Sequence, residues 1–347
     1  MEKAYIIAAE SSIDGNGSFD NYESIELSFK ENNIPATHFY IDPLKAGWHS
    51  KPLKNHFRSG CAPVEAVHEA AEQIIDKTAQ VVVISGEDNL RSSYPRETRQ
   101  KMMAIYGDGL SIVDLYNRLA ETFIQAHQTS KDDFKQIAGE LFENYRRTYS
   151  RKNSDCNPDA KWFEYITDLF RGVDCANPMI DFKGKLIVCN KKTAFACGIE
   201  ERDLIEIAGT GISSTEDGPE NIHKIAEYAH LVQAYESACK AAGVDIGAEF
   251  LNKNALLEIY TCYPVVPLAF LLKTGIADSY KHIPALLNQY EITVTGGMNL
   301  CKAPWNNPSL NALVQMYREL QNGPFQYGAV HGNGGLGYKQ GVVILKA

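Results

Sequence analysis

The sequence has 347 residues, 44% of them hydrophobic, and its 34 Lys and Arg against 43 Asp and Glu give a net charge of −9. That length predicts about two domains, and the acidic balance argues against a nucleic-acid-binding protein, which normally carries a basic face. No apolar run reaches the roughly 18 residues of a membrane span, so we expect a soluble, cytoplasmic protein. The eight cysteines form no CxxC or CxxH pair, so we expect neither a disulfide scaffold nor a metal site.

The first 90 residues alternate between strand-like and helix-like patterns. Short apolar or β-branched runs predict strands, and apolar residues at helical spacing predict helices. The predicted elements are a strand at 5–9, a helix at 20–32, a strand at 37–41, a helix at 62–76 and a strand at 81–84. This alternation predicts a layered α/β domain.

The last 145 or so residues show the same alternation of strand-like and helix-like patterns. The predicted elements are strands at 203–208, 256–260, 291–295, 327–331 and 341–345, and helices at 221–242, 308–320 and over the apolar residues up to 272. When the chain is shifted on itself by about 246 positions, residues 61–88 fall on 307–334, helix on helix and strand on strand. The matching order of elements predicts two similar halves that face each other.

The segment between the halves, residues 91–180, has a different composition. It holds 13 Lys and Arg and 13 Asp and Glu, so the charge of −9 belongs to the rest of the chain. Its predicted helices, at 111–127, 132–149 and 160–169, indicate a cap inserted over the α/β core, where ligands are often held. A solvated helical decoration is the alternative. The predicted division is 1–90 plus 181–212 for the N-terminal half, 91–180 for the cap and 213–347 for the C-terminal half.

One cysteine stands where a helix is predicted to begin. Cys61 precedes Ala62 and Pro63, and proline is favoured in the first turn of a helix. The positive end of the helix dipole and the free N–H groups there would favour a thiolate. Most free cysteines are small core residues, so the motif alone does not assign a nucleophile.

Two further segments carry residue types that suit a site. The run His331-Gly332-Asn333-Gly334-Gly335-Leu336-Gly337 allows close backbone approach and could direct N–H groups at an oxyanion, or could be a hairpin turn with a satisfied histidine. No Lys-Ser or Lys-Thr follows, so it is not a phosphate loop. The run from Glu258 to Pro264 places Tyr260 and Cys262 at the end of a strand, a usual place for α/β sites, although a packed strand edge explains it locally.

Taken together, these segments resemble the thiolase superfamily over nearly the whole chain, and most of all its thiolase-like, sterol-carrier-protein-type branch. The helix SGCAPVEAVHEAAEQI with the strand AQVVVISGED resembles the segment that carries the family's nucleophilic cysteine. The other three matching segments are GPENIHKIAEYAHLVQAYESACKAAG with LLEIYTCYP, ITVTGGMNLCKAPWNNPSLNALVQMY, and AVHGNGGLGY. The resemblance implies two βαβαβαββ halves in an α/β/α/β/α core with an inserted cap.

The resemblance also implies site residues, with several departures. Cys61 takes the place of the acyl-accepting cysteine, and Gly334 and Gly335 keep glycines that help to hold the thioester oxygen. Ala303 stands where the family's GHP motif has its histidine, and His331 stands where the family has a second cysteine. Losing the GHP histidine should cost several orders of magnitude in rate unless another base substitutes. His331 could be that base in a Cys–His dyad with Cys61.

The leading hypothesis from the sequence is an acyl-CoA-dependent acyltransferase, similar to acetyl-CoA acetyltransferases, that works through a cysteine-bound acyl group. Tyr260, Cys262, Asn306 and Asn307 are polar candidates for its second site. The candidates for the CoA phosphates, where bidentate donors are favoured, are Arg146, Arg147 and Arg151.

The alternative hypothesis is a catalytically silent thiolase fold that binds acyl-CoA or serves as a scaffold. A condensing enzyme of the ketoacyl-synthase type fits less well, because it would need a histidine near Tyr260. Family resemblance implies a homodimer and allows a small OB-fold or acyl-carrier partner. A close approach of Cys61 to His331 would favour the enzyme, and a His331 turned away would favour the silent protein.

Overall fold

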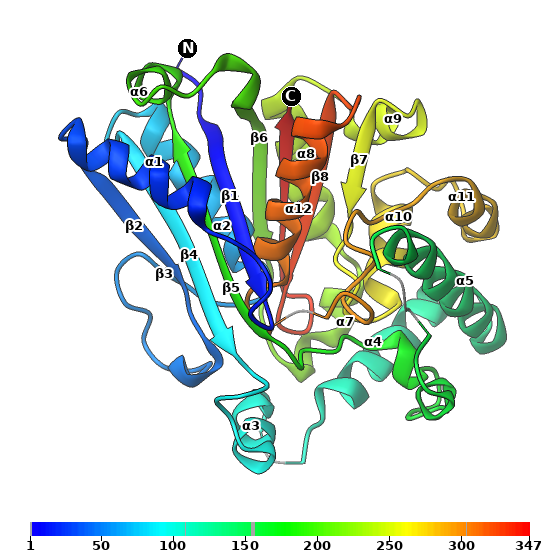
Figure 1. Ribbon diagram of the computed structural model, residues 1–347. Coiled ribbons are helices and arrows are strands. Elements are labelled where there is room, and N and C mark those ends of the chain that lie inside the picture. The colour runs from blue at the N-terminus through cyan, green and yellow to red at the C-terminus, as the bar shows by residue number, and fades with distance from the viewer. Residues whose placement is uncertain (1, 108, 154–156, 303) are drawn as a thin grey trace.

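The structure is a computed structural model that describes residues 2–107, 109–153, 157–302 and 304–347 (Figure 1). Its described strands form a mixed sheet in the order β3-β2-β4-β5-β1-β6-β9-β8-β7. The strands are β1 Tyr5–Ile13, β2 Ala36–Ile41, β3 His56–Phe57, β4 Val81–Asn89, β5 Asp181–Cys189, β6 Ile205–Ser214, β7 Ala255–Glu258, β8 Tyr327–Gly334 and β9 Lys339–Lys346.

Helices cover both faces of this sheet and form the cap. They are α1 Asp20–Glu31, α2 Ala62–Ile75, α3 Arg96–Met103, α4 Ile112–Ala126, α5 Lys131–Ser150, α6 Lys191–Ala196, α7 Ile222–Ala226, α8 Ala229–Ala242, α9 Ile246–Leu251, α10 Val265–Lys273, α11 Ile283–Gln289 and α12 Pro308–Asn322. None of the described helices is long and apolar enough to cross a membrane.

The sheet consists of the same four-strand pattern used twice. The order β1-β5-β4-β2 in the first half corresponds to β6-β9-β8-β7 in the second, with the same antiparallel and parallel pairings. Both halves also have a β-bulge after the second residue pair of the first strand, at Ile6/Ala8 and at Ile207/Gly209. The duplication predicted from the shift of 246 residues is therefore present, because α2 and α12, and β4 and β8, begin that far apart.

Two of the helices occupy the layer between the halves. Helices α2 and α12 pack on each other, and each contacts strands of both halves. Apolar side chains from these helices and from both parts of the sheet form one central core, which includes Ile6, Val64, Leu310 and Val343. Helix α1 packs on the outer face of the first half, and α8 on that of the second. This layering is the α/β/α/β/α arrangement that the resemblance implied.

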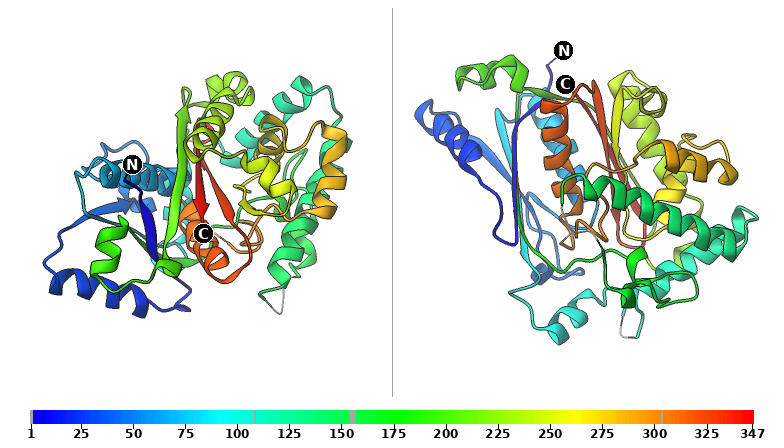
Figure 2. Two further views of the ribbon diagram at one scale, coloured as in Figure 1. Left: turned by 90° about the horizontal axis from the view of Figure 1, so that it is seen from above. Right: turned by 45° about the vertical axis from the view of Figure 1, so that its right-hand side comes forward.

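The cap is the long connection from β4 to β5, two neighbouring antiparallel strands. Its helices α4 and α5 lie on the β7 side of the molecule, next to α10 and α11 (Figures 1 and 2). The repeat of the topology begins with β6 at Ile205, inside the segment that the sequence division assigned to the N-terminal half.

Three predicted elements differ in the structure. The predicted helix at 221–242 is divided into α7 and α8, because Tyr228 adopts a left-handed conformation with φ 53°. The predicted helix at 160–169 is only a short 3-10 turn, Ala160–Phe163. Residues 291–295 form no strand, because the backbone N–H groups of Val294 and Thr295 donate to the Glu258 carboxylate instead of a neighbouring strand.

Candidate functional site

A pocket of about 280 Å³ lies between the cap, the loop before α2 and the C-terminal half. Its walls are mainly apolar and aromatic, and none of its lining side chains is charged. The lining residues are Trp48, Gly60, Met103, Ile105, Ile112, Val113, Tyr116, Ala176, Pro178, Tyr260, Cys262, Tyr263, Met298, Trp305, Asn306, Asn333 and Gly335. Such a pocket suits a small, uncharged, largely apolar group.

Cys61 does not line this pocket. It is the residue before α2, as predicted, but its side chain is fully buried in the central core. A Cβ atom added to Gly341 would lie 2.8 Å from the Cys61 Sγ, and one added to Gly332 would lie 3.3 Å from it. These two glycines pair across β8 and β9, so together they leave the space that the sulfur occupies. Burial, with the nearby Glu65 carboxylate, raises the pKa of the Cys61 thiol well above its ordinary value.

The second half of the fold repeats this arrangement with a different residue. Asn307 precedes α12 as Cys61 precedes α2, and a Cβ atom added to Gly86 would overlap its side-chain oxygen. Gly86 and Gly184 pair across β4 and β5, as Gly332 and Gly341 pair across β8 and β9. The position before each central helix is therefore occupied by a side chain packed against a glycine of the facing strand pair, and this packing role requires no thiol.

The residues immediately before these two positions do line the pocket. They are Gly60 in the first half and Asn306 in the second. A Cβ atom added to Gly60 would overlap the hydroxyl of Tyr260 and the backbone oxygen of Asn333, so no larger side chain fits there. Asn306 donates from Nδ2 to the backbone oxygen of Asp42 over 2.7 Å. At the start of α2, the residue that faces the pocket thus has no nucleophilic side chain.

His331 is directed away from Cys61, which corrects the predicted dyad. Gly332 faces α2, so its neighbour His331 projects from the opposite face of β8. The His331 Nδ1 accepts the backbone N–H of Tyr260 at 3.3 Å, and its Nε2 lies 2.7 Å from the Gln340 Oε1. These partners require the neutral ring with its proton on Nε2. Burial lowers the pKa of His331 to about 4, so it is a poor proton acceptor near neutral pH.

The His331 ring begins a buried chain of side-chain hydrogen bonds that ends at the pocket. Gln340 donates from Nε2 to the Asn333 Oδ1 over 2.7 Å, and Asn333 donates from Nδ2 to the Tyr116 hydroxyl over 2.9 Å. Tyr116 in turn donates to the backbone oxygen of Gly335 over 2.7 Å. Because every member has a partner, the chain fixes Asn333 and Tyr116 in the pocket wall.

The glycine run after His331 is a hairpin turn that the cap covers. Gly334 ends β8, and Gly335 and Gly337 have φ values of 53° and 102° in the turn before β9. The Tyr106 hydroxyl accepts the Leu336 N–H over 2.7 Å, and Tyr116 binds the Gly335 oxygen. The structure supports the turn, which was the alternative to an oxyanion site, although Gly335 does line the pocket.

The polar candidates from the end of β7 do reach the pocket. Tyr260 and Cys262 line it, as does Tyr263, whose ring stacks on Tyr116 with centroids 4.1 Å apart. Burial raises the pKa of Cys262 to about 12, so its sulfur remains a thiol. Burial also raises the pKa of the Tyr260 hydroxyl, which therefore stays a hydrogen-bond donor.

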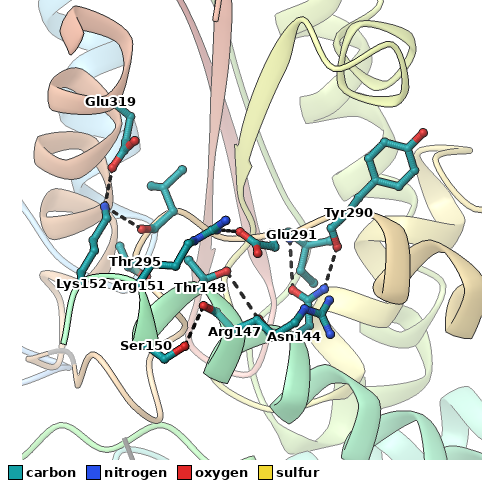
Figure 3. A network of polar contacts seen from close by, with 12 residues as sticks. Asn144, Arg147, Thr148, Ser150, Arg151, Lys152, Tyr290, Glu291, Thr295 and Glu319 are labelled. Carbon is teal, nitrogen blue, oxygen red and sulfur yellow. Dashed lines mark hydrogen bonds and ion pairs between the residues drawn. The ribbon is translucent and has the colours of Figure 1, made fainter. Parts of the chain in front are cut away.

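Of the three predicted phosphate-binding arginines, Arg146 and Arg147 lie on α5 and Arg151 directly follows it; none of them lines the pocket. Arg147 donates to the backbone oxygen of Leu287. Arg151 forms an ion pair with Glu291, which Figure 3 shows. Arg146 donates to the Glu143 carboxylate. The contacts of Arg147 and Arg151, with those of Asn144 to the backbone of Leu287, Tyr290 and Ile292, fasten the end of α5 to α11 and the segment that follows it.

Other candidate residues can be placed as follows. Ala303, at the position of the missing histidine, lies outside the described residues. Asn307 is buried, and its side-chain amide has no hydrogen-bond partner among the described residues. Within the described ranges, no group of three or more His, Cys, Asp or Glu side chains could hold a metal ion.

Sequence reasoning missed several pocket residues that lie outside any chemical motif. Trp48 comes from the loop before β3, Met103 from the end of α3, and Trp305 from the loop before α12. The available signal was indirect: two of the three tryptophans stand in loops next to glycine or proline, where a large aromatic is often part of a site.

Comparisons with known proteins give the fold. No protein-family model matches the chain, and no curated protein matches it. Among solved structures, the chain is similar to the crystal structure of a monomeric SCP2-thiolase-like protein type 1 from Mycobacterium smegmatis, with a TM-score of 0.73 and 17% identity. The match covers 99% of this chain and 77% of that one. The chain therefore has a thiolase-like fold, as the resemblance in its sequence predicted.

Proposed function

We propose that the protein binds an acyl thioester of the acyl-CoA type, with the acyl group in the uncharged pocket, and forms no cysteine-bound intermediate. The observation that carries this proposal is the placement of the start of α2. Gly60 faces the pocket, whereas the Cys61 thiol is seated on Gly332 and Gly341 in the central core. This is the silent alternative that the sequence allowed.

Further observations support binding without turnover. A thiolate at Cys61 would be buried, with the Glu65 carboxylate nearby and the opposing Lys339 ammonium already paired with that carboxylate. Among the described residues, no donor makes a hydrogen bond to its sulfur. His331, the expected base, uses both ring nitrogens elsewhere. The aromatic walls supply the apolar contact that an acyl chain requires, at about 0.8 kcal/mol for each buried methylene group. The thiolase-like fold supports an acyl-CoA-type ligand for this pocket.

The test combines a binding measurement with a search for a covalent adduct. Hexanoyl-CoA should bind in calorimetry and change the emission of Trp48 and Trp305, which line the pocket. Trp162 lies on the surface with 45% of its area exposed, so Trp162→Phe should leave this change intact and serves as the control. Free CoA should bind more weakly, because it lacks the acyl group.

Two outcomes would overturn the proposal. Absence of binding by hexanoyl-CoA would exclude acyl-CoA thioesters as ligands of this protein. An acyl adduct in intact-mass measurement that disappears in Cys61→Ala would restore the acyltransferase predicted from the sequence. The same samples test assembly by light scattering: the resemblance implies a homodimer, whereas the solved protein of similar fold is described as monomeric.

A further inference from the structure

Two tyrosine hydroxyls in the pocket have no hydrogen-bond partner among the described residues. They belong to Tyr260 and Tyr263, whereas the third, that of Tyr116, binds Asn333 and Gly335. Tyr260 is 92% buried, and its hydroxyl lies directly against Gly60. The Tyr260 hydroxyl therefore has a free donor at the pocket wall, and a ligand acceptor placed against it would gain a hydrogen bond.

The Tyr260 ring is held in position from behind. Its backbone N–H donates to His331, and the two rings meet edge to face with centroids 6.4 Å apart. The absence of a side chain at Gly60 gives the hydroxyl its space, and the backbone oxygen of Asn333 closes the same corner. The donor is therefore fixed before a ligand arrives, which reduces the entropy that binding would cost.

The pocket offers no counter-ion for a charged ligand group. Among its lining residues there is no Lys, Arg or His. A carboxylate moved from water into such a site would lose its hydration without gaining a cation. A neutral carbonyl needs only one good donor, and the Tyr260 hydroxyl is one. The lining thus distinguishes an esterified acyl group from the free acid.

We propose that the pocket selects neutral acyl derivatives, thioesters or esters, by a hydrogen bond from the Tyr260 hydroxyl to the acyl carbonyl oxygen, and that it rejects the corresponding carboxylates. This inference rests on the proposed function, since it assumes that the acyl group occupies the pocket. Beyond the proposed function, it specifies the chemical class of the ligand and the residue that recognises it. No bond to the ligand is formed or broken in this recognition.

Three small probes test the inference without the CoA nucleotide. They are S-hexanoyl-N-acetylcysteamine, the matching S-hexyl thioether, which lacks the carbonyl, and hexanoate, all measured by tryptophan emission near pH 8, where the acid is ionised. The wild-type protein should bind the thioester about 3- to 10-fold more tightly than the thioether, as one hydrogen bond implies. Hexanoate should bind at least about 100-fold more weakly than the thioester.

The variants Tyr260→Phe and Tyr263→Phe separate the two hydroxyls. Tyr260→Phe should bind thioester and thioether equally while its affinity for the thioether stays within about 2-fold of wild type, which also shows that the pocket is folded. Equal binding of the two probes by the wild-type protein would overturn the inference while leaving the proposed function intact. So would a carbonyl preference that survives in Tyr260→Phe and disappears in Tyr263→Phe. If none of the neutral probes and no acyl-CoA binds, the proposed function itself fails.

Discussion

Substitution of Cys61 tests whether this residue belongs to the core or to a reaction. In Cys61→Ala the sulfur is removed from a fully buried position bounded by Gly332, Gly341 and Val64. The two glycines have no side chains that could move into the space, so a cavity of about one methyl group remains. We expect the free energy of unfolding to fall by about 1–2 kcal/mol.

Cys61→Ser sharpens the test, because serine keeps nearly the same shape. Its hydroxyl would be buried beside the glycine pair, and an unsatisfied polar group there costs about 1–3 kcal/mol. We therefore expect stability to decrease in the order wild type, Ala, Ser in urea unfolding. Cys197, which is partly exposed, provides the matched control, and Cys197→Ala should change stability little.

Ligand binding completes this prediction. Because Cys61 lies behind the pocket wall rather than in it, the dissociation constant for hexanoyl-CoA should change by no more than about 2-fold in Cys61→Ala. A variant that keeps wild-type stability but loses the ligand, or loses a covalent adduct that the wild type forms, would refute the packing role. Fast alkylation of Cys61 in the native protein at neutral pH would refute it as well.

Three further predictions follow from buried groups. Burial raises the pKa of Glu258 from 4.5 to about 7, so between these pH values the folded protein holds a proton that the unfolded chain has lost. The free energy of unfolding should therefore fall as pH rises through this interval, by about 3 kcal/mol in total. Glu258→Gln should abolish this pH dependence in urea unfolding from about pH 4 to pH 8. Burial lowers the pKa of His331 from 6.5 to about 4, so stability is instead lost as pH falls through this interval, by a similar amount. His331→Gln should remove that loss. An unchanged pH profile in either variant would show that the substituted residue does not cause the pH dependence. Gly60→Ala should lower the free energy of unfolding by about 1–3 kcal/mol and weaken ligand binding. Adding Tyr260→Phe should not restore stability, because the Asn333 backbone oxygen still blocks the space for a side chain. Full recovery in the double variant would show that the Tyr260 hydroxyl alone excludes a side chain at position 60.

The duplicated fold could be predicted from the sequence because its signals are local and occur twice. The helices at 62–76 and 308–320, each followed by a short apolar strand, stand 246 residues apart in both the sequence and the structure. The extended segment at 291–295 could not be separated from a strand in this way. Its β-branched residues fit both, and only the position of the Glu258 carboxylate shows that a side chain takes its N–H groups.

The site was harder to predict because two adjacent residues at a helix start point in different directions. Sequence reasoning located Tyr260, Cys262 and Asn306, which line the pocket. It chose Cys61 over Gly60 because only a cysteine carries reactive chemistry, and no property of the sequence gives the direction of a side chain at the first turn. The arginines at the end of α5 were chosen as bidentate donors for phosphate, but Arg147 and Arg151 are held by a carbonyl and a carboxylate from distant parts of the chain.

The internal repeat supplies an argument about Cys61 that does not depend on its chemistry. A duplicated fold solves the same packing problem twice, so a buried position can be compared with its counterpart in the other half. Asn307 occupies the counterpart of Cys61, against Gly86 of the corresponding glycine pair. Two side chains as different as a thiol and an amide share one location, and what they share is size and burial. The constraint at this position is therefore the space above the glycines, whereas chemical recognition belongs to the adjacent layer, where Gly60 gives the Tyr260 hydroxyl its place.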